Sequence, residues 1–527
     1  MKPGYFPMHD DLQVMRVLEM KKCLIDLQIP CRYVSDMGFG YGYPQFQYYG
    51  PLPYYFMGGL AVMGLDYLTA VKIGFLAALL LGNITMYFLG NYLYGPWGGL
   101  LSSLAYAYLP FRSSDVYSRG AMAESWAFVF LPLIVLTSLK FLKNPKIKSL
   151  CLASISLSLL FVTHNVTTLT FGPLFALLFL VSGIINKIPF KKIAKYFAVL
   201  LVWSIALASF FFLPAYLEKG LAHTESLTSG YFNFLAHFVS LKQSLLTYFW
   251  AYGSSEIGPT DDLSLMVGPF QLTLLLLILI KLAFSKFREK NSRIVVAFIF
   301  LFVVSLFMTH QKSSFIWQNI SVMSYLQFPW RYLVTTTFFL TLALGFLFQS
   351  INHTVLKLVL VGLIIFFNIS FFRPIRWIQI TPEEKIIGNL WEKQLTISIF
   401  DYLPKVADFP PTQVAPTRPY FTDQNNKGAI YEISKKTNQY NFSLKTQTGG
   451  EMVIPLFNYP GWIVEINNKK VPVSSFSNLG LISFKVEPGD SRVRALFQET
   501  PLRLFSNIIS LISVTISLYI LRSKKYV

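Results

Sequence analysis

Long apolar runs recur along this chain, and they constrain its fold more than any other feature. A run of roughly 20 apolar residues can cross the hydrocarbon core of a bilayer as an α-helix. Inside a bilayer all backbone groups must be satisfied within the protein, which helices achieve. The runs therefore predict a polytopic bundle of transmembrane helices. The candidate spans, several of them shorter than a full crossing, are 70–90, 97–110, 121–143, 149–163, 166–186, 194–213, 264–284, 294–310, 332–350, 356–373 and 503–521.

The charge distribution supports this class. Charged residues make up 13% of the chain, about half of the roughly 25% typical of soluble domains. The net charge of +19 would suggest a nucleic-acid partner in a soluble protein. Here the basic residues lie in short loops between spans, so we expect contact with membrane lipids and no nucleic acid. These loops contain Lys140, Lys143, Lys146 and Lys148; Lys187, Lys191, Lys192 and Lys195; Lys286, Arg288, Lys290 and Arg293; and Arg522, Lys524 and Lys525.

The positive-inside rule places the basic loops in the cytoplasm and the remaining loops outside the plasma membrane. Residue 1 then also lies outside, which leads us to expect a further apolar helix upstream of it. From about residue 429, short β runs separated by turns predict a small antiparallel β-sandwich. The chain thus divides into a transmembrane domain (1–373) with external loops 1–55 and 214–263, an extracytoplasmic segment (374–502), and a last helix with a basic tail (503–527).

The stretch Pro7–Tyr55 is too polar and too rich in Gly, Pro and Tyr to span a membrane. It carries Asp10 and Asp11 ahead of every apolar segment, and these are the main catalytic candidates. The pair can alternatively hold a divalent metal such as Mg²⁺ or Mn²⁺. After them, Leu12–Leu27 has helical apolar spacing, which predicts an amphipathic helix in the headgroup plane.

Two further features of this loop leave alternatives open. Cys23 and Cys31 either form a disulfide or remain free. Its aromatic residues form an interfacial belt or stack on sugar rings. They are Tyr41, Tyr43, Phe46, Tyr48, Tyr49, Tyr54 and Tyr55.

Polar residues at the outer ends of other spans complete the candidate site. Arg112, Arg119 and Glu124 surround the start of one span; Glu124 is either in an ion pair with one of these arginines or faces a polar cavity. His164 is either a helix cap or a binding residue. Trp330 and Arg331 precede another span, and the fork of donors on Arg331 matches a phosphate.

Several motifs together resemble a known family of bacterial membrane proteins. They are the opening His9-Asp10-Asp11, the run GYGYPQFQYYGPLPYY, the loop YSRGAMAE, the segment FPWRYL and the YPGW turn in the β region. The chain resembles proteins described as 6-pyruvoyl-tetrahydropterin synthase-related and is similar to YfhO-type proteins. Both look like members of the GT-C class of glycosyltransferases.

The resemblance implies an inverting transfer of a sugar from a polyprenyl-phosphate donor to a glycan, lipid or protein acceptor in the cell envelope. Asp10 or Asp11 would act as base, and Glu124 would position the acceptor or a metal. His9, Arg112, Arg119, His164, Trp330 and Arg331 would bind the substrates. No pterin chemistry is expected, because the chain lacks a zinc-binding histidine set.

Two other classes of function remain open. A lipid or glycan transporter or flippase would use the same polar residues without bond chemistry, but it predicts internal repeats that this sequence does not show. A non-catalytic envelope-assembly protein would bind through its β region and would not need Asp10 and Asp11. The glycosyltransferase interpretation predicts that both aspartates meet Arg119 and Arg331 in one external cavity.

Overall fold

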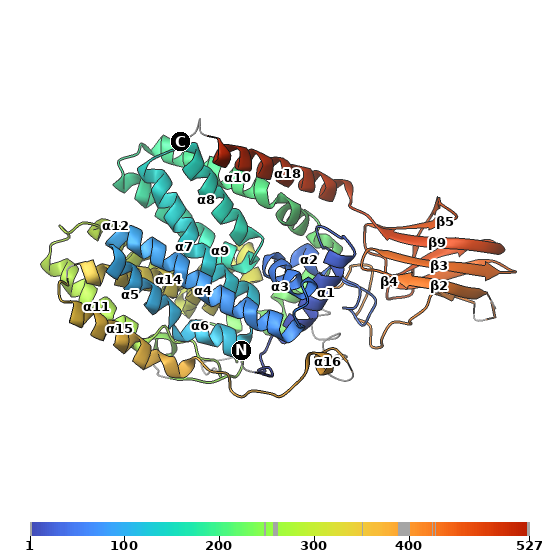
Figure 1. Cartoon of the computed structure of the whole chain (residues 1–527), viewed down its shortest axis with the longest axis horizontal. Helices are drawn as coiled ribbons and strands as arrows, with labels where there is room; N and C mark the ends of the chain where they lie inside the picture. Colours follow the sequence, from blue (N-terminus) through green and yellow to red (C-terminus); the bar gives the residue numbers. More distant parts are fainter. Residues whose placement is uncertain are drawn as a thin grey trace.

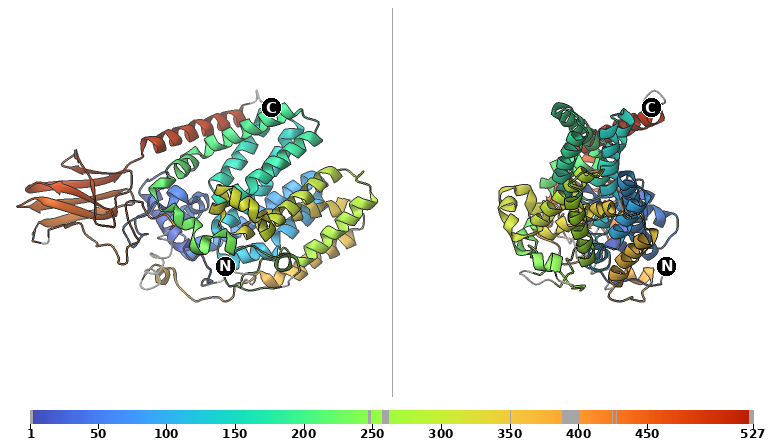
Figure 2. Two further views of the ribbon diagram at one scale, coloured as in Figure 1. Left: turned by 180° about the vertical axis from the view of Figure 1, so that it is seen from behind. Right: turned by 90° about the vertical axis from the view of Figure 1, so that its left-hand side faces the viewer.

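A helical bundle and a β-sheet region that projects from one of its ends make up the molecule (Figures 1 and 2). This computed structural model describes residues 3–246, 249–256, 262–349, 351–387, 401–423, 425–426 and 428–523. The last helix, α18, runs from the β region back along the bundle. The predicted class is confirmed: a mostly helical multi-pass membrane protein with a C-terminal β region before a last apolar helix.

Eight segments of the described chain are long and apolar enough to cross a membrane as helices. They are α4 (Tyr67–Tyr94), α7 (Met122–Lys143), α9 (Asn165–Ile185), α10 (Phe190–Leu217), α12 (Ser292–Thr309), Pro329–Gln349 with α14 (Leu333–Leu344), Thr354–Phe371 with α15 (Thr354–Asn368), and α18 (Pro501–Arg522). The other three predicted spans are shorter helices: α5 (Pro96–Ala107), α8 (Ile147–Phe161) and α11 (Pro269–Phe284). Prolines 96 and 110 bound α5, because proline lacks the N–H that continues a helix.

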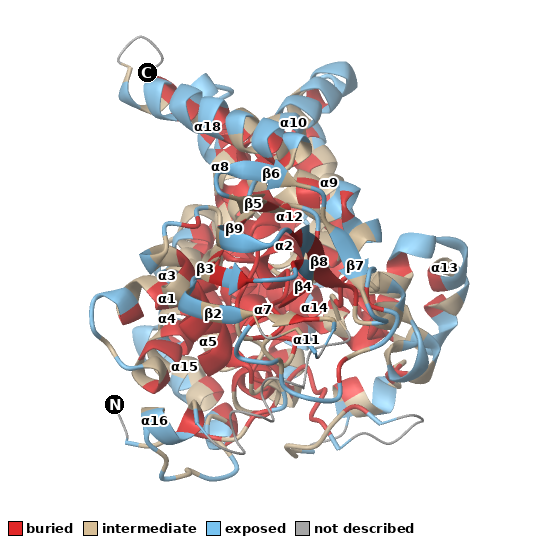
Figure 3. Cartoon of the chain, turned by 90° about the vertical axis from the view of Figure 1, so that its right-hand side faces the viewer, coloured by how far each residue is buried: buried red, intermediate tan, exposed pale blue. Residues whose placement is uncertain are grey.

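The helices differ in how deeply they are buried. In the segment Pro329–Gln349, 94% of the residues in its most apolar part are buried inside the protein, whereas in α18 the buried share is 28%. The outer faces of α10 and α18 are exposed (Figure 3) and carry large apolar side chains such as Val202 and Leu511. In a membrane these faces contact lipid, while Pro329–Gln349 forms the centre of the bundle.

Two of the predicted cytoplasmic loops lie at the bundle end far from the β region, where both contact the end of α4. Lys140 and Lys143, at the end of α7, lie over the ring of Tyr92 in α4. Asn291, in the loop between α11 and α12, donates from Nδ2 to the carbonyl of Leu93. The basic clusters of these two loops are therefore on one side of the bundle. Lys524 and Lys525 lie outside the described residues.

The N-terminal stretch forms a folded layer over the opposite end of the bundle. It contains α1 (Gln13–Ile25), α2 (Gln45–Tyr48) and α3 (Leu52–Val62), with α1 packed on α3 and α4. Helix α1 packs into the protein on its polar as well as its apolar side, because Gln13, Arg16 and Glu19 are buried along with its apolar residues. A disulfide joins Cys23 and Cys31 at the end of α1.

Short helices lie between the spans or form the ends of two of them. Within loop 214–263, positions 247–248 and 257–261 are outside the described residues. The short helices are α6 (Pro110–Ser114), η1 (Asp115–Arg119), η2 (Lys219–Leu221), η3 (Thr224–Thr228), η4 (Gly230–Phe232), η5 (Phe234–Ala236), η6 (Lys242–Leu246), η7 (Gln311–Ser313), α13 (Ser314–Asn319), η8 (Ser321–Leu326), η9 (Pro329–Tyr332), η10 (Gly345–Gln349), η11 (Ile369–Phe371) and α16 (Pro382–Lys385).

The β region consists of two antiparallel sheets with a shared core. The sheet orders are β1-β4-β8-β7 and β2-β3-β9-β5-β6. Buried residues of both sheets, such as Phe484 of one and Phe442 of the other, belong to one core cluster. The strands begin nine positions before the expected residue 429, at Tyr420. They are β1 (Tyr420–Phe421), β2 (Ala429–Lys435), β3 (Gln439–Thr446), β4 (Gly450–Phe457), β5 (Trp462–Ile466), β6 (Lys469–Val471), β7 (Ser474–Phe476), β8 (Leu481–Val486) and β9 (Gly489–Phe497).

Aromatic residues of the N-terminal layer attach the β region to the bundle. Tyr33 packs edge-on against Trp462, with ring centroids 5.5 Å apart. The hydroxyl of Tyr48 lies 2.9 Å from that of Tyr459. Tyr41 of the aromatic run also contacts the β region, through the ring of Phe457. Two residues of this run, Tyr41 and Tyr48, therefore belong to an interface within the protein, which sequence alone did not predict.

A buried carboxyl in α1 makes the stability of this layer depend on pH. Oε2 of Glu19 accepts hydrogen bonds from the backbone N–H groups of Ser35 and Asp36, at 2.9 and 3.4 Å. Burial raises the pKa of Glu19 to about 8. The unfolded value is about 4.3. Between these pH values the folded protein keeps a proton that the unfolded chain has released, so stability falls as pH rises through this window.

We therefore expect Glu19→Gln to stabilise the protein at alkaline pH. The amide oxygen can accept the same backbone hydrogen bonds, and the substituted side chain cannot ionise. In melting curves of the detergent-solubilised protein, the Tm advantage of the variant should grow as pH rises from about 5 to about 8.5. A Tm difference that is the same at both pH values would contradict this interpretation.

Candidate functional site

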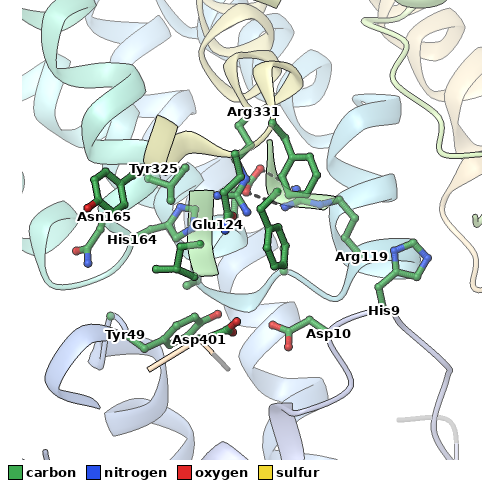
Figure 4. Close-up of a pocket in the computed structure, with 18 of the residues that line it drawn as sticks. His9, Asp10, Tyr49, Arg119, Glu124, His164, Asn165, Tyr325, Arg331 and Asp401 are labelled. Carbon is green, nitrogen blue, oxygen red and sulfur yellow. Dashed lines mark hydrogen bonds and ion pairs between the residues drawn. The ribbon is translucent and has the colours of Figure 1, made fainter. Parts of the chain in front are cut away.

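A cavity of about 540 Å³ lies between the N-terminal layer and the end of the helical bundle (Figure 4). Its wall combines segments that are far apart in sequence: the N-terminal layer, the start of α7, the cap of α9, loop 214–263, the start of Pro329–Gln349 and residues 401–402. Seven of the nine predicted site residues line it. They are His9, Asp10, Arg119, Glu124, His164, Trp330 and Arg331.

Backbone pairing with η1 holds Asp10 at the cavity. The N–H groups of His9 and Asp10 donate to the carbonyls of Ser118 and Arg119, both at 3.0 Å. Oδ2 of Asp10 accepts from Nη1 of Arg16 at 2.7 Å and from Nε2 of Gln13 at 3.0 Å. The Asp10 side chain is still 32% exposed, so the carboxylate is both fixed and accessible.

Asp11 has a different environment, although it is the next residue. It does not belong to the cavity wall, and its Oδ2 accepts from Nζ of Lys385 at 2.5 Å. The predicted acidic pair therefore separates, with only Asp10 in the cavity. Among the described residues, no group of three or more His, Cys, Asp or Glu side chains could hold a metal ion.

Glu124 is in an ion pair and also faces the cavity, so the structure combines the two alternatives considered for it. Both of its oxygens accept from Arg119, at 2.8 and 3.1 Å. Arg119 also donates to Asp115, and its guanidinium lies 4.5 Å from the centre of the Trp330 ring. Glu124 therefore neutralises Arg119, and the bonds to Glu124 and Asp115 together fix its position.

Arg331 differs from Arg119 in having no carboxylate partner in the described part of the chain. Its buried Nε has no hydrogen-bond partner there, and its guanidinium lies 5.2 Å from the centre of the Phe328 ring. The side chain lines the cavity near the paired Arg119 and Glu124 (Figure 4). A cation with unused donors in a cavity is suited to bind an anionic ligand group.

The two histidines of the cavity wall, His9 and His164, and Trp330 form mainly structural contacts. His164 caps α9, with Nδ1 2.7 Å from Oγ1 of Thr167, and burial lowers the pKa of His164 to about 4. It is therefore neutral at physiological pH. His9 contacts the carbonyl of Tyr252 at 2.9 Å through Nε2. Trp330 donates from Nε1 to Oγ of Ser255 at 3.1 Å.

Arg112 lies outside the cavity wall, in the interior of the bundle. Its Nη1 donates to Oδ1 of Asn83 at 2.7 Å, and its guanidinium lies 4.8 Å from the centre of the Tyr106 ring. These contacts join α4, α5 and α6. The position of Arg112 next to a span end in sequence could not distinguish this packing role from a binding role.

Two charged residues of the cavity were not predicted from the sequence. Arg16 is 4% exposed and links α1 to Asp10. In the sequence it is one charge within the predicted amphipathic helix, and nothing there marks it as part of a site. Asp401 belongs to the mixed segment after the spans, where no local pattern marks a site.

Charged residues line opposite sides of the cavity. Asp10 and Asp401 lie on one side, and Arg119, Glu124 and Arg331 lie on the other (Figure 4). A substrate with an anionic group and a hydroxyl group would meet the unpaired arginine at one end and free carboxylate oxygens at the other.

Comparison with known proteins identifies the family. A search of curated proteins gives no match. A family model described as "6-pyruvoyl-tetrahydropterin synthase related domain; membrane protein" matches residues 46–376. The matched range contains Arg119, Glu124, His164 and Arg331, but begins after Asp10. The chain therefore belongs to the 6-pyruvoyl-tetrahydropterin synthase-related family of membrane proteins.

Proposed function

We propose that this protein is an inverting glycosyltransferase of the GT-C type that uses a polyprenyl-phosphate-linked sugar. The observation that carries the proposal is the cavity in which Arg331, a cation without an ion pair among the described residues, faces an accessible carboxylate on Asp10. The leaving phosphate needs a cation and the attacking hydroxyl needs a base, and this cavity holds one of each.

The chemistry follows from this placement. The acceptor oxygen forms a bond to the anomeric carbon as the bond from that carbon to the phosphate oxygen breaks. The phosphate leaves with the bonding electrons, and Arg331 neutralises its charge. Asp10 takes the proton from the acceptor hydroxyl. Arg119 is paired with Glu124, which leaves Arg331 as the cation available to the phosphate among the described residues of the cavity.

The orientation of the bundle is consistent with an active face outside the plasma membrane. Two of the loops rich in Lys and Arg lie together at the end of α4, and the positive-inside rule expects this end to face the cytoplasm. An external cavity would be open to acceptors of the cell envelope, whether glycan, lipid or protein.

The residues of this cavity do not fit the Mg²⁺ or Mn²⁺ considered from the sequence. Asp10 is already bonded to Arg16 and Gln13, and Asp11 is bonded to Lys385 away from the cavity. A divalent cation usually requires several converging oxygen ligands. The proposed mechanism therefore assigns no step to a metal ion.

A transfer assay tests the proposal. The purified protein in nanodiscs would be incubated with polyprenyl-phosphate sugars and membrane extract, and the release of polyprenyl phosphate would be followed by mass spectrometry. We expect release that depends on both the donor and the extract. Movement of the intact lipid between leaflets without release would support the transporter alternative and overturn the proposal.

A further inference from the structure

The carboxylate side of the cavity is built partly by a segment from outside the helical bundle. Asp401 and Tyr402 follow the last span of the bundle by about thirty positions, yet both line the cavity with Asp10. The N–H of Tyr402 donates to the hydroxyl of Tyr43 at 2.6 Å, and its ring stacks on Tyr48 with centroids 5.4 Å apart. These contacts hold Asp401 at a defined place in the wall.

The next residue fixes the same segment on its other side. The carbonyl of Leu403 accepts a 2.8 Å hydrogen bond from the N–H of His223 in loop 214–263. Leu403 itself is buried in the core cluster that contains Tyr41 and Phe457. The position of Asp401 is therefore set by the N-terminal layer, the β region and loop 214–263 together.

The carboxyl of Asp401 has acceptor capacity that the described residues leave unused, since none of them forms a hydrogen bond or ion pair with it. The Asp401 side chain is partly buried, and burial raises the pKa of Asp401 to about 6. The charge of Arg16 lowers this pKa, and that of Asp10 raises it. At neutral pH the group is mostly ionised and accepts hydrogen bonds. A ligand with several donors would satisfy it.

Arg16, which is bonded to Asp10 and also lines the cavity, is likewise incompletely bonded. It is 4% exposed, and its Nε has no hydrogen-bond partner among the described residues. Its guanidinium lies 4.4 Å from the centre of the Tyr49 ring. Tyr48, Tyr49 and Tyr402 therefore add aromatic surface beside a cluster of acceptors and one buried donor. Hydroxyl groups on an apolar ring face match this combination, which is the chemistry of a sugar.

We infer that Asp10, Arg16, Asp401 and the rings of Tyr48, Tyr49 and Tyr402 form an acceptor subsite for an uncharged or amino sugar. This inference rests on the proposed function and extends it, because it names the acceptor class and a binding residue from the extramembrane segment. Two carboxylates in this subsite repel a uronic acid, whereas hydroxyl and ammonium groups donate to them. The arginine side is left for the donor phosphate.

Binding of simple methyl glycosides to the whole protein in nanodiscs tests the subsite. Saturation-transfer NMR would compare a methyl hexoside, a methyl aminohexoside and a methyl hexuronide. We expect the first two to bind and the hexuronide not to bind. The Asp401→Asn variant should bind the methyl hexoside about 10–100-fold more weakly, as for loss of a hydrogen bond to a charged group. The matched control is Asp408→Asn, since Asp408 is exposed on the same segment and outside the cavity.

The outcomes separate this inference from the proposed function. Unchanged glycoside binding in Asp401→Asn, or equal binding of the hexuronide to the wild type, would overturn the subsite. Polyprenyl phosphate binding, measured on the same samples, should be unaffected by Asp401→Asn. If polyprenyl phosphate binds and no glycoside does, the subsite is wrong and the donor side stands. If glycosides bind in this manner and polyprenyl phosphate does not, the subsite stands and the proposed donor is wrong.

Discussion

Replacing Asp10 with Asn should lower the rate of sugar transfer by about 10²–10⁴-fold, the usual contribution of a general base. The amide retains an oxygen that can accept from Gln13 and Arg16, so the layer can keep its local structure, but it cannot take a proton. Binding of polyprenyl phosphate should be retained, because Asp10 and Arg331 lie on opposite sides of the cavity.

Asp11→Asn is the matched control for this experiment. The two residues are adjacent, have the same chemistry and belong to the same motif, but Asp11 is bonded to Lys385 outside the cavity. Its variant should keep most of the transfer activity. Because Arg16 is buried, melting curves must show that Asp10→Asn remains folded. Full activity in a folded Asp10→Asn protein, or an equal loss in Asp11→Asn, would defeat the assignment of the base.

Arg331→Ala should weaken binding of polyprenyl phosphate by about 10–100-fold, which corresponds to losing hydrogen bonds between charged groups. The stability of the protein should change little, because the described residues place no carboxylate in an ion pair with Arg331. Binding can be measured in nanodiscs by quenching of tryptophan fluorescence, since Trp330 lies in the same wall.

Two variants sharpen this test. Arg119→Ala removes the partner of two buried carboxylates, Asp115 and Glu124, and should destabilise the protein by about 3–5 kcal/mol. Arg492→Ala removes a charge of the same type from an exposed position in β9 and should change neither binding nor stability. If Arg331→Ala binds polyprenyl phosphate as well as the Arg492→Ala control does, Arg331 is not the phosphate residue.

The remaining interpretations make different demands on these residues. A non-catalytic assembly protein would tolerate Asp10→Asn and Arg331→Ala alike, because its function would reside in the β region. A transporter would respond to Arg331→Ala, but would show no chemical product in any variant. The two substitutions together therefore distinguish all three classes.

The sequence alone determined the membrane class, the β region and the last helix. These depend on local properties: apolar runs long enough to cross a bilayer, and alternating runs separated by turns. It also indicated that Asp10, Glu124 and Arg331 belong to one face, because Asp10 lies in a predicted external loop and the other two lie at or near the outer ends of predicted spans. Helix length was less predictable. In α5, flanking prolines rather than hydropathy set the ends.

Only the tertiary structure decided which of these charges share a cavity. Asp10 and Asp11 are indistinguishable in sequence, and their roles separate through partners 6 and 374 positions away, Arg16 and Lys385. Asp401 and Tyr402 reach the cavity through contacts with Tyr43 and Tyr48, which no local pattern encodes. The physical reason is that hydropathy is summed along the chain, whereas the partner of a charged side chain is set by packing between distant segments.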